Sequence, residues 1–245
     1  MNQKDFDQFF SILKPIVDSG RSDDFFKRHP LEELDLSQDQ AVRLLKYLNA
    51  HKLASLCAKC FGFPMDYTPE SLLYLDVAVS SLCALDLDDT QLTRLLYREP
   101  DMPRDWADPA LQLLLAYTIK TRRQTRKTDR EDLDPAQLFS QTDDSVIAEL
   151  IADINAYLCE TFLNCYGGGW VCDAVKDGHV DALGVQAKNG DYLSFIDAVY
   201  RRFYEDPTPL AYLFCAVCGL DYAALPAMLS GDAGPAESND VSETF

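Results

Sequence analysis

The sequence has no long apolar run and no pattern that marks an exported protein. Its longest apolar stretch, LAYLFCAVCGL at 210–220, is shorter than the roughly 18 residues that a membrane span needs. The first ten residues, MNQKDFDQFF, contain no basic segment followed by an apolar one, so they do not resemble a secretory signal. We therefore expect a cytoplasmic protein with no membrane partner. In that reducing compartment its eight cysteines would remain thiols.

The patterns of common active sites are lacking too. The chain has only three histidines, His29, His51 and His179, and none stands in the HExxH spacing of a zinc peptidase. No GxSxG sequence places a serine nucleophile. The glycines 167–169 follow no predicted strand and precede no Lys-Ser/Thr pair, so they favour a helix end over a phosphate loop. The sequence therefore predicts that the protein is not an enzyme and has no cofactor.

Alternating apolar and polar residues, which are typical of strands, are scarce, whereas helix signals are frequent. A Thr or Asp can cap a first turn that proline opens, and this pair occurs at Thr68-Pro69, Asp108-Pro109, Asp134-Pro135 and Thr208-Pro209. Ser37 and Gln40 form a potential capping box, and Asn189-Gly190 lies between helical patterns. The helices are expected at 4–18, 38–49, 51–61, 69–85, 89–98, 109–128, 144–166, 170–177, 192–205, 209–218 and 222–229. We predict an all-α fold, either a multi-helix bundle or an irregular helical solenoid of about ten helices.

A polar stretch after residue 130 suggests a division of the chain. The segment KTDREDLDPAQLFSQTDD could join an N-terminal helical subdomain, 1–130, to a C-terminal one, 131–230. The last residues, 231–245, are small, polar and acidic, and cannot bury enough apolar surface to become ordered. We expect them to form a disordered acidic tail.

Positive charge is scarce in this chain. Twenty-two Lys and Arg residues face 40 Asp and Glu residues, which gives a net charge of −18. Long-range repulsion would oppose general binding to nucleic acid or to an anionic membrane. The scattered acids favour solubility. The alternative is an acidic inhibitor that imitates nucleic acid and occupies the basic groove of another protein.

One segment gathers the positive charge that the rest of the chain lacks. Placed on a helix at 100° per residue, its six basic side chains fall within an arc of about 160°. They are Lys120, Arg122, Arg123, Arg126, Lys127 and Arg130. Such segregation exceeds what the end of a helix needs to balance its dipole. We expect this basic face to bind a partner, either the phosphates of a nucleic acid or an acidic protein surface, including a second copy of this chain.

Two CxxC pairs offer a possible metal site. Cys57 with Cys60, and Cys215 with Cys218, could supply four thiolates to a zinc ion. Each pair lies within an apolar helical run, however, where residues at i and i+3 share one face and small cysteines pack well. Packing is therefore the favoured interpretation, with zinc as the alternative.

Together these features predict a non-enzymatic protein-interaction module, an adaptor or regulator within a complex. The first alternative is a nucleic-acid-associated subunit that binds phosphates through residues 120–130, and the second is the acidic nucleic-acid mimic. A protein partner is expected, and the oligomeric state stays open.

Overall fold

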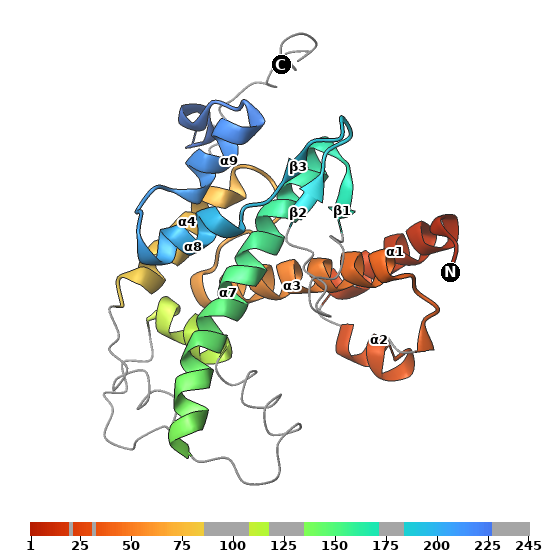
Figure 1. Cartoon of the computed structure of the whole chain (residues 1–245), viewed down its shortest axis with the longest axis horizontal. Coiled ribbons are helices and arrows are strands. Elements are labelled where there is room, and N and C mark those ends of the chain that lie inside the picture. The colour runs from red at the N-terminus through yellow and green to blue at the C-terminus, as the bar shows by residue number, and fades with distance from the viewer. Residues whose placement is uncertain (20–21, 31–32, 86–107, 118–134, 172–183, 227–245) are drawn as a thin grey trace.

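The computed structural model describes residues 1–19, 22–30, 33–85, 108–117, 135–171 and 184–226. These residues form eight α-helices and one small three-stranded sheet (Figure 1). The prediction of a mostly helical protein is confirmed, whereas the prediction of an all-α fold is wrong. The proposed subdomain boundary at residue 130 and the predicted tail, 231–245, lie outside the described residues.

The N-terminal helices α1 (Gln3–Asp18) and α2 (Ser22–Arg28) build a small aromatic cluster against α3. The side chain of Asn2 caps α1 by accepting a hydrogen bond from the backbone N–H of Asp5 at 2.9 Å. Apolar residues spaced three and four apart then form one buried face. The cluster consists of Phe6, Phe10, Leu13, Val17, Leu44 and Tyr47, with Phe9, Phe25 and Phe26 packed against it.

Helix α3 (Gln38–Phe61) is a single helix of 24 residues, where two helices had been predicted. Ser37 and Gln40 form the predicted capping box. Gly62 ends the helix in the left-handed conformation, with φ 73°, which glycine adopts without steric cost. Its first half contributes Leu44 and Tyr47 to the aromatic cluster, and its second half contributes Ala50, Leu53, Ala54 and Cys57 to the main core. One helix therefore joins the two clusters.

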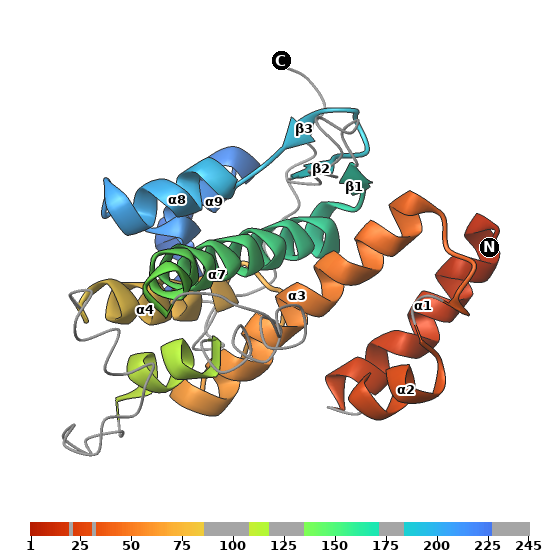
Figure 2. The same cartoon turned by 60° about the horizontal axis from the view of Figure 1, so that its bottom comes forward.

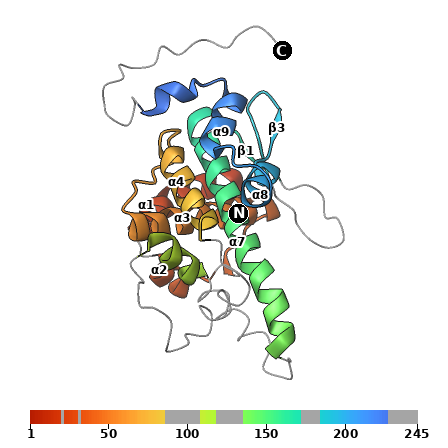
Figure 3. The same cartoon turned by 90° about the vertical axis from the view of Figure 1, so that its left-hand side faces the viewer.

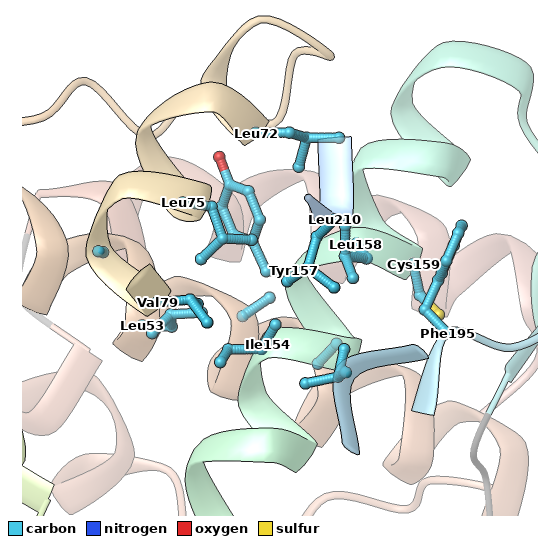
Figure 4. Packing of buried hydrophobic residues seen from close by; sticks show 14 of the residues in the cluster. Leu53, Leu72, Leu75, Val79, Ile154, Tyr157, Leu158, Cys159, Phe195 and Leu210 are labelled. Atoms are coloured by element: carbon cyan, nitrogen blue, oxygen red, sulfur yellow. The ribbon is translucent and has the colours of Figure 1, made fainter. Parts of the chain in front are cut away.

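The main core surrounds α7 (Pro135–Tyr166), a helix of 32 residues. Residues 153–161 of α7 are all buried, as expected for a helix enclosed by other elements. In Figure 2, α7 lies between α3 on one side and the pair α8 (Ile196–Tyr204) and α9 (Leu210–Cys218) on the other. Figure 3 shows α7 running between α4 (Ser71–Cys83) and α8. In Figure 4, side chains from these elements converge around Tyr157.

A three-stranded antiparallel sheet follows α7, in the order β1 (Gly169–Val171), β2 (Gly184–Gln186) and β3 (Tyr192–Leu193). It replaces the start of the helix predicted at 170–177. Trp170 pairs with Val185, and both side chains are buried, so burial of this face stabilises the short strands. Asn189-Gly190 forms the turn between β2 and β3, where Gly190 has φ 96°. This dipeptide is a hairpin signal, and its placement between helices was wrong.

Helix α9 (Leu210–Cys218) closes the core and ends at Gly219, with φ 66°. The predicted cap at Thr208-Pro209 is wrong, because the Thr208 hydroxyl instead bonds to Asp206. The cap comes from Asp76 in α4. Its two carboxylate oxygens accept hydrogen bonds from the backbone N–H groups of Leu210 at 2.6 Å and Ala211 at 2.9 Å. A short 3₁₀ turn, η2 (Tyr222–Ala224), follows α9.

Candidate functional site

The six residues of the predicted basic face, Lys120, Arg122, Arg123, Arg126, Lys127 and Arg130, lie outside the described residues. The start of their predicted helix is described, and residues 109–117 are helical. Leu113, Leu114 and Tyr117 are buried there, whereas Gln112 is exposed. On a helix at 100° per residue, these buried residues lie mainly on the side opposite the six basic residues, and Gln112 lies on the basic side. The binding role of the basic face stays a prediction.

The structure does not bring the two CxxC pairs together as a metal site. Among the described residues, no group of three or more His, Cys, Asp or Glu side chains is arranged to hold a metal ion. Cys57 and Cys215 are buried in the main core. Burial raises the pKa of Cys57 to about 12 and that of Cys215 to about 11. A raised pKa favours the neutral thiol over the thiolate that binds metal.

A cavity of about 360 Å³ opens where the aromatic cluster meets the C-terminal half of α7. It takes its walls from α1, α3, the segment between α3 and α4, and α7. The lining residues are Phe10, Lys14, Asp18, Arg43, Tyr47, Tyr67, Glu160, Leu163, Asn164, Gly167 and Gly168. Its volume lies within the range of roughly 300–1,000 Å³ that is typical of small-molecule sites.

Two basic side chains enter this cavity over aromatic rings. The ammonium of Lys14 lies 5.5 Å from the ring centroid of Phe10 and 5.1 Å from that of Tyr47. The guanidinium of Arg43 lies 4.7 Å from the Phe10 centroid, and its Nη1 is 3.0 Å from Asp7 Oδ1. Cation–π contacts of this kind hold the cations in place without neutralising their charge.

Two acidic side chains complete the polar lining, and each already accepts a hydrogen bond. Asp18 Oδ1 accepts from the Tyr47 hydroxyl at 3.0 Å. Glu160, only 8% exposed, accepts from Trp170 Nε1 at 2.8 Å. Burial raises the pKa of Glu160, and the hydrogen bond from Trp170 opposes that rise.

Tyr67 is fixed at the inner wall in an unusual backbone conformation. Its φ of 61° is the one positive value among the described residues other than glycine. Its N–H donates to the Tyr157 hydroxyl at 3.1 Å, and its carbonyl accepts from Asn164 Nδ2 at 3.2 Å. Its ring stacks on that of Tyr157 at a centroid distance of 4.9 Å. Its buried hydroxyl has no hydrogen-bond partner among the described residues. A polar group held this firmly without a partner is uncommon in a protein interior.

Beside the cavity, Asp18 also approaches a histidine–serine pair on α3. Its Oδ1 lies 3.4 Å from His51 Nδ1, and His51 Nε2 lies 3.0 Å from Ser55 Oγ. Ser55, His51 and Asp18 are arranged in the order of the nucleophile, base and acid of a catalytic triad. Ser55 sits in the middle of α3, however, where the helix occupies the backbone N–H groups that an oxyanion would need. We interpret the contact as one that holds the end of α1 against α3.

A second polar cluster joins α3, α7 and the helix that contains residues 109–117. Lys52 pairs with Glu149 at 2.6 Å and with Asp153. The Tyr117 hydroxyl donates to Asp153 Oδ2 at 2.9 Å, and the Lys52 ammonium lies 4.5 Å from the Tyr117 ring centroid. Burial raises the pKa of Asp153, and Lys52 opposes that rise. The cluster fixes the helix that leads towards the basic segment.

No protein family, curated protein or solved structure matches this chain significantly. Function must therefore be inferred from the site itself. The described part of the chain contains no helix with both the length and the apolar character that crossing a membrane requires.

The sequence did not predict the cavity, because its walls come from distant positions. Lys14 and Gly168 are separated by most of the chain, and no local motif links them. One signal was available. Glu160 interrupts the apolar run of α7 at a position that the surrounding pattern buries, and buried acids need partners.

Proposed function

We propose that the protein is a non-enzymatic interaction module, an adaptor or regulator that works in the cytoplasm and binds a protein partner through the outer surface of α8 and α9. One observation carries the proposal. Five of the ten exposed large apolar side chains in the described part of the chain come from this short region. They are Tyr200, Tyr204, Tyr212, Val217 and Leu220.

The chemistry of these side chains suits a protein interface. Tyr200 and Tyr204 lie side by side on α8, with ring centroids 4.7 Å apart. Tyr212 on α9 is half exposed and meets Tyr222 edge to face at 5.7 Å. Tyrosine combines a large apolar area with a polar tip and few rotatable bonds, which explains its enrichment at binding hot spots.

Affinity capture from the native cell tests the proposal. Two double variants, Tyr200→Ser with Tyr204→Ser and Tyr212→Ser with Val217→Ser, should each reduce recovery of a specific partner about tenfold. The matched control is Ile12→Ser, which removes an equally exposed apolar side chain from α1. Circular dichroism must show that all variants stay folded. If the double variants and the control recover the same partners in the same amounts, the proposal is wrong.

The basic segment 120–130 is a second proposed contact. A partner with an acidic surface, or a nucleic acid, would meet it through charge, whereas the α8–α9 surface binds through apolar area. The acidic mimic stays an alternative, supported only by the net charge of −18. These interpretations differ in their response to salt, since charge contacts weaken as ionic strength rises.

A further inference from the structure

We propose that the cavity bounded by α1, α3 and α7 is a binding site for a small organic anion, whose carboxylate or phosphoryl oxygens contact the Lys14 ammonium and the Tyr67 hydroxyl. The site is separate from the α8–α9 surface and does not depend on the function proposed for that surface. Some polar groups in the cavity have hydrogen-bond partners and others have none, and this difference indicates the class of ligand.

Both carboxylates of the cavity already accept one hydrogen bond. Asp18 receives the hydroxyl of Tyr47, and Glu160 receives the indole N–H of Trp170. The side-chain amide of Asn164 is likewise committed, to the carbonyl of Tyr67. A ligand that offered only donors would therefore have to displace contacts that the protein has already made.

The donors, by contrast, are in excess. Within the described residues Lys14 forms no hydrogen bond or ion pair; its ammonium lies over the faces of two rings and attracts the Glu160 carboxylate through space. An ammonium has three N–H donors and no acceptor. The Tyr67 hydroxyl is buried without a partner, whereas the guanidinium of Arg43 already pairs with Asp7. An anionic oxygen could accept from the ammonium and the hydroxyl together, whereas a cationic ligand could satisfy neither donor.

The strained backbone of Tyr67 supports the assignment of the cavity as a binding site. A non-glycine residue at φ 61° is energetically unfavourable, and such residues persist where the surrounding structure holds them, often at functional sites. Here the N–H, the carbonyl and the ring are each held by a residue of α7. Tyr67 is thereby held at the wall of the cavity before any ligand arrives, which reduces the ordering needed on binding.

The apolar part of the lining favours an organic ligand over a bare inorganic ion. Phe10 and Leu163 contribute carbon surface beside the charged groups. Burial also raises the pKa of Glu160, while the hydrogen bond from Trp170 and the charges of Lys14 and Arg43 oppose that rise. The negative net charge of the protein weakens anion binding at long range, but salt screens charges beyond about 8 Å at physiological ionic strength.

The test compares three ligands that share one benzene ring: benzoate, phenyl phosphate and benzylamine. Isothermal titration calorimetry on the full chain should detect one or both anions with a dissociation constant below about 1 mM, and no binding of benzylamine. Whichever anion binds more tightly identifies the preferred group. Inorganic phosphate, tested alone, should bind more weakly than phenyl phosphate.

Two variants locate the site. Tyr67→Phe removes only the hydroxyl, and Lys14→Met removes the ammonium but keeps a linear side chain. Each should weaken anion binding about tenfold or more, as expected for a hydrogen bond to a charged group. Tyr200→Phe and Lys59→Met make the same changes outside the cavity and should leave the affinity unchanged. If Lys14→Met does not fold, Lys14→Gln replaces it.

Three results would overturn the proposal. The first is that no anion binds at up to about 10 mM. The second is that benzylamine binds as well as the anions. The third is that the anions bind the Tyr67 and Lys14 variants as tightly as wild type, which would place them elsewhere on the protein. Tyr67→Phe should also leave the ligand-free protein as stable as before or slightly more so, because it removes an unpaired buried hydroxyl.

Discussion

Replacing Asp76 with alanine should loosen α9 from the rest of the core. Asp76 lies in α4, 9% exposed, and its two oxygens accept from the N–H groups of Leu210 and Ala211 at 2.6 and 2.9 Å. The first N–H groups of a helix have no partner within the helix. Pro209, which precedes them, supplies no side-chain cap. The substitution would thus leave two buried donors without an acceptor.

The size of the effect follows from this geometry. A hydrogen bond to a charged group contributes about 1.5–3 kcal/mol, so two such bonds set an upper limit of about 6 kcal/mol. Desolvation of the buried carboxylate, which raises its pKa, offsets part of this gain. We expect Asp76→Ala to reduce the free energy of unfolding by about 2–4 kcal/mol. Asp76→Asn keeps one acceptor and should lie between alanine and wild type.

Guanidinium denaturation measures the change in stability, and hydrogen exchange locates it. The amides of Leu210 and Ala211 should exchange faster in Asp76→Ala, with smaller changes in α1. The control is Asp197→Asn, which removes an exposed carboxylate from the first turn of α8 and should change stability by less than about 0.5 kcal/mol. Wild-type stability in Asp76→Ala, together with unchanged exchange at Leu210 and Ala211, would refute the reasoning.

Three further predictions test other parts of the structure. Gly168 has φ 117°, and a Cβ added to it would lie 2.2 Å from the Gln186 carbonyl oxygen. Gly168→Ala should therefore destabilise the protein by about 2 kcal/mol or more. Gly169→Ala, where no atom lies near the added Cβ, should lower the melting temperature much less. Because burial raises the pKa of Glu160, the folded state binds the extra proton and stability should fall as pH rises through the folded pKa; Glu160→Gln should flatten this slope in denaturation curves measured from about pH 4 to 8. In the basic segment, four residues are changed together to Gln: Arg122, Arg123, Arg126 and Lys127. The variant should keep the circular dichroism spectrum of the wild type and should weaken a salt-sensitive complex with nucleic acid or an acidic protein. Unchanged binding at low salt would contradict a binding role for this segment.

Local signals in the sequence predicted much of the helical framework. The capping box at Ser37 is present, and Asp108 Oδ1 accepts from the backbone N–H of Ala110 at 2.8 Å. Thr68 Oγ1 accepts from the N–H of Ser71 at 3.3 Å in the turn before α4, but the N-cap of that helix is Glu70, without a side-chain cap, so the cap predicted at Thr68 is wrong. Gly62 and Gly219 end helices in the left-handed conformation that favours glycine. Each of these features depends on residues within a few positions of one another, which is the range over which caps act.

The features that the sequence did not predict depend on distant partners. Thr208 seemed a good cap by residue type, but Asp76 takes that role from another helix. The strands have two or three residues each, too few for an alternating pattern to be visible. The Asn189-Gly190 dipeptide is a hairpin signal, but the strands on either side of it are too short to show the alternation that would support it. Tyr67 could not be identified as a site residue, because its position depends on Tyr157 and Asn164, about ninety residues later in the chain.

The position of the cavity suggests what a ligand would do to the protein. Lys14 belongs to α1, which packs on the small aromatic cluster, whereas Tyr67 is held by the main core. Helix α3 is continuous between the two clusters, but the cavity separates the face of α1 from the end of α7. The two clusters already meet where the ring centroids of Tyr47 and Tyr67 lie 6.4 Å apart, and an anion that contacts both Lys14 and Tyr67 would add a further link between them. A ligand that binds the folded state stabilises the elements that it contacts. Because Lys14 belongs to α1, added ligand should slow hydrogen exchange in α1 more than in α9. Equal protection of both helices would instead indicate that the two clusters already unfold as one unit.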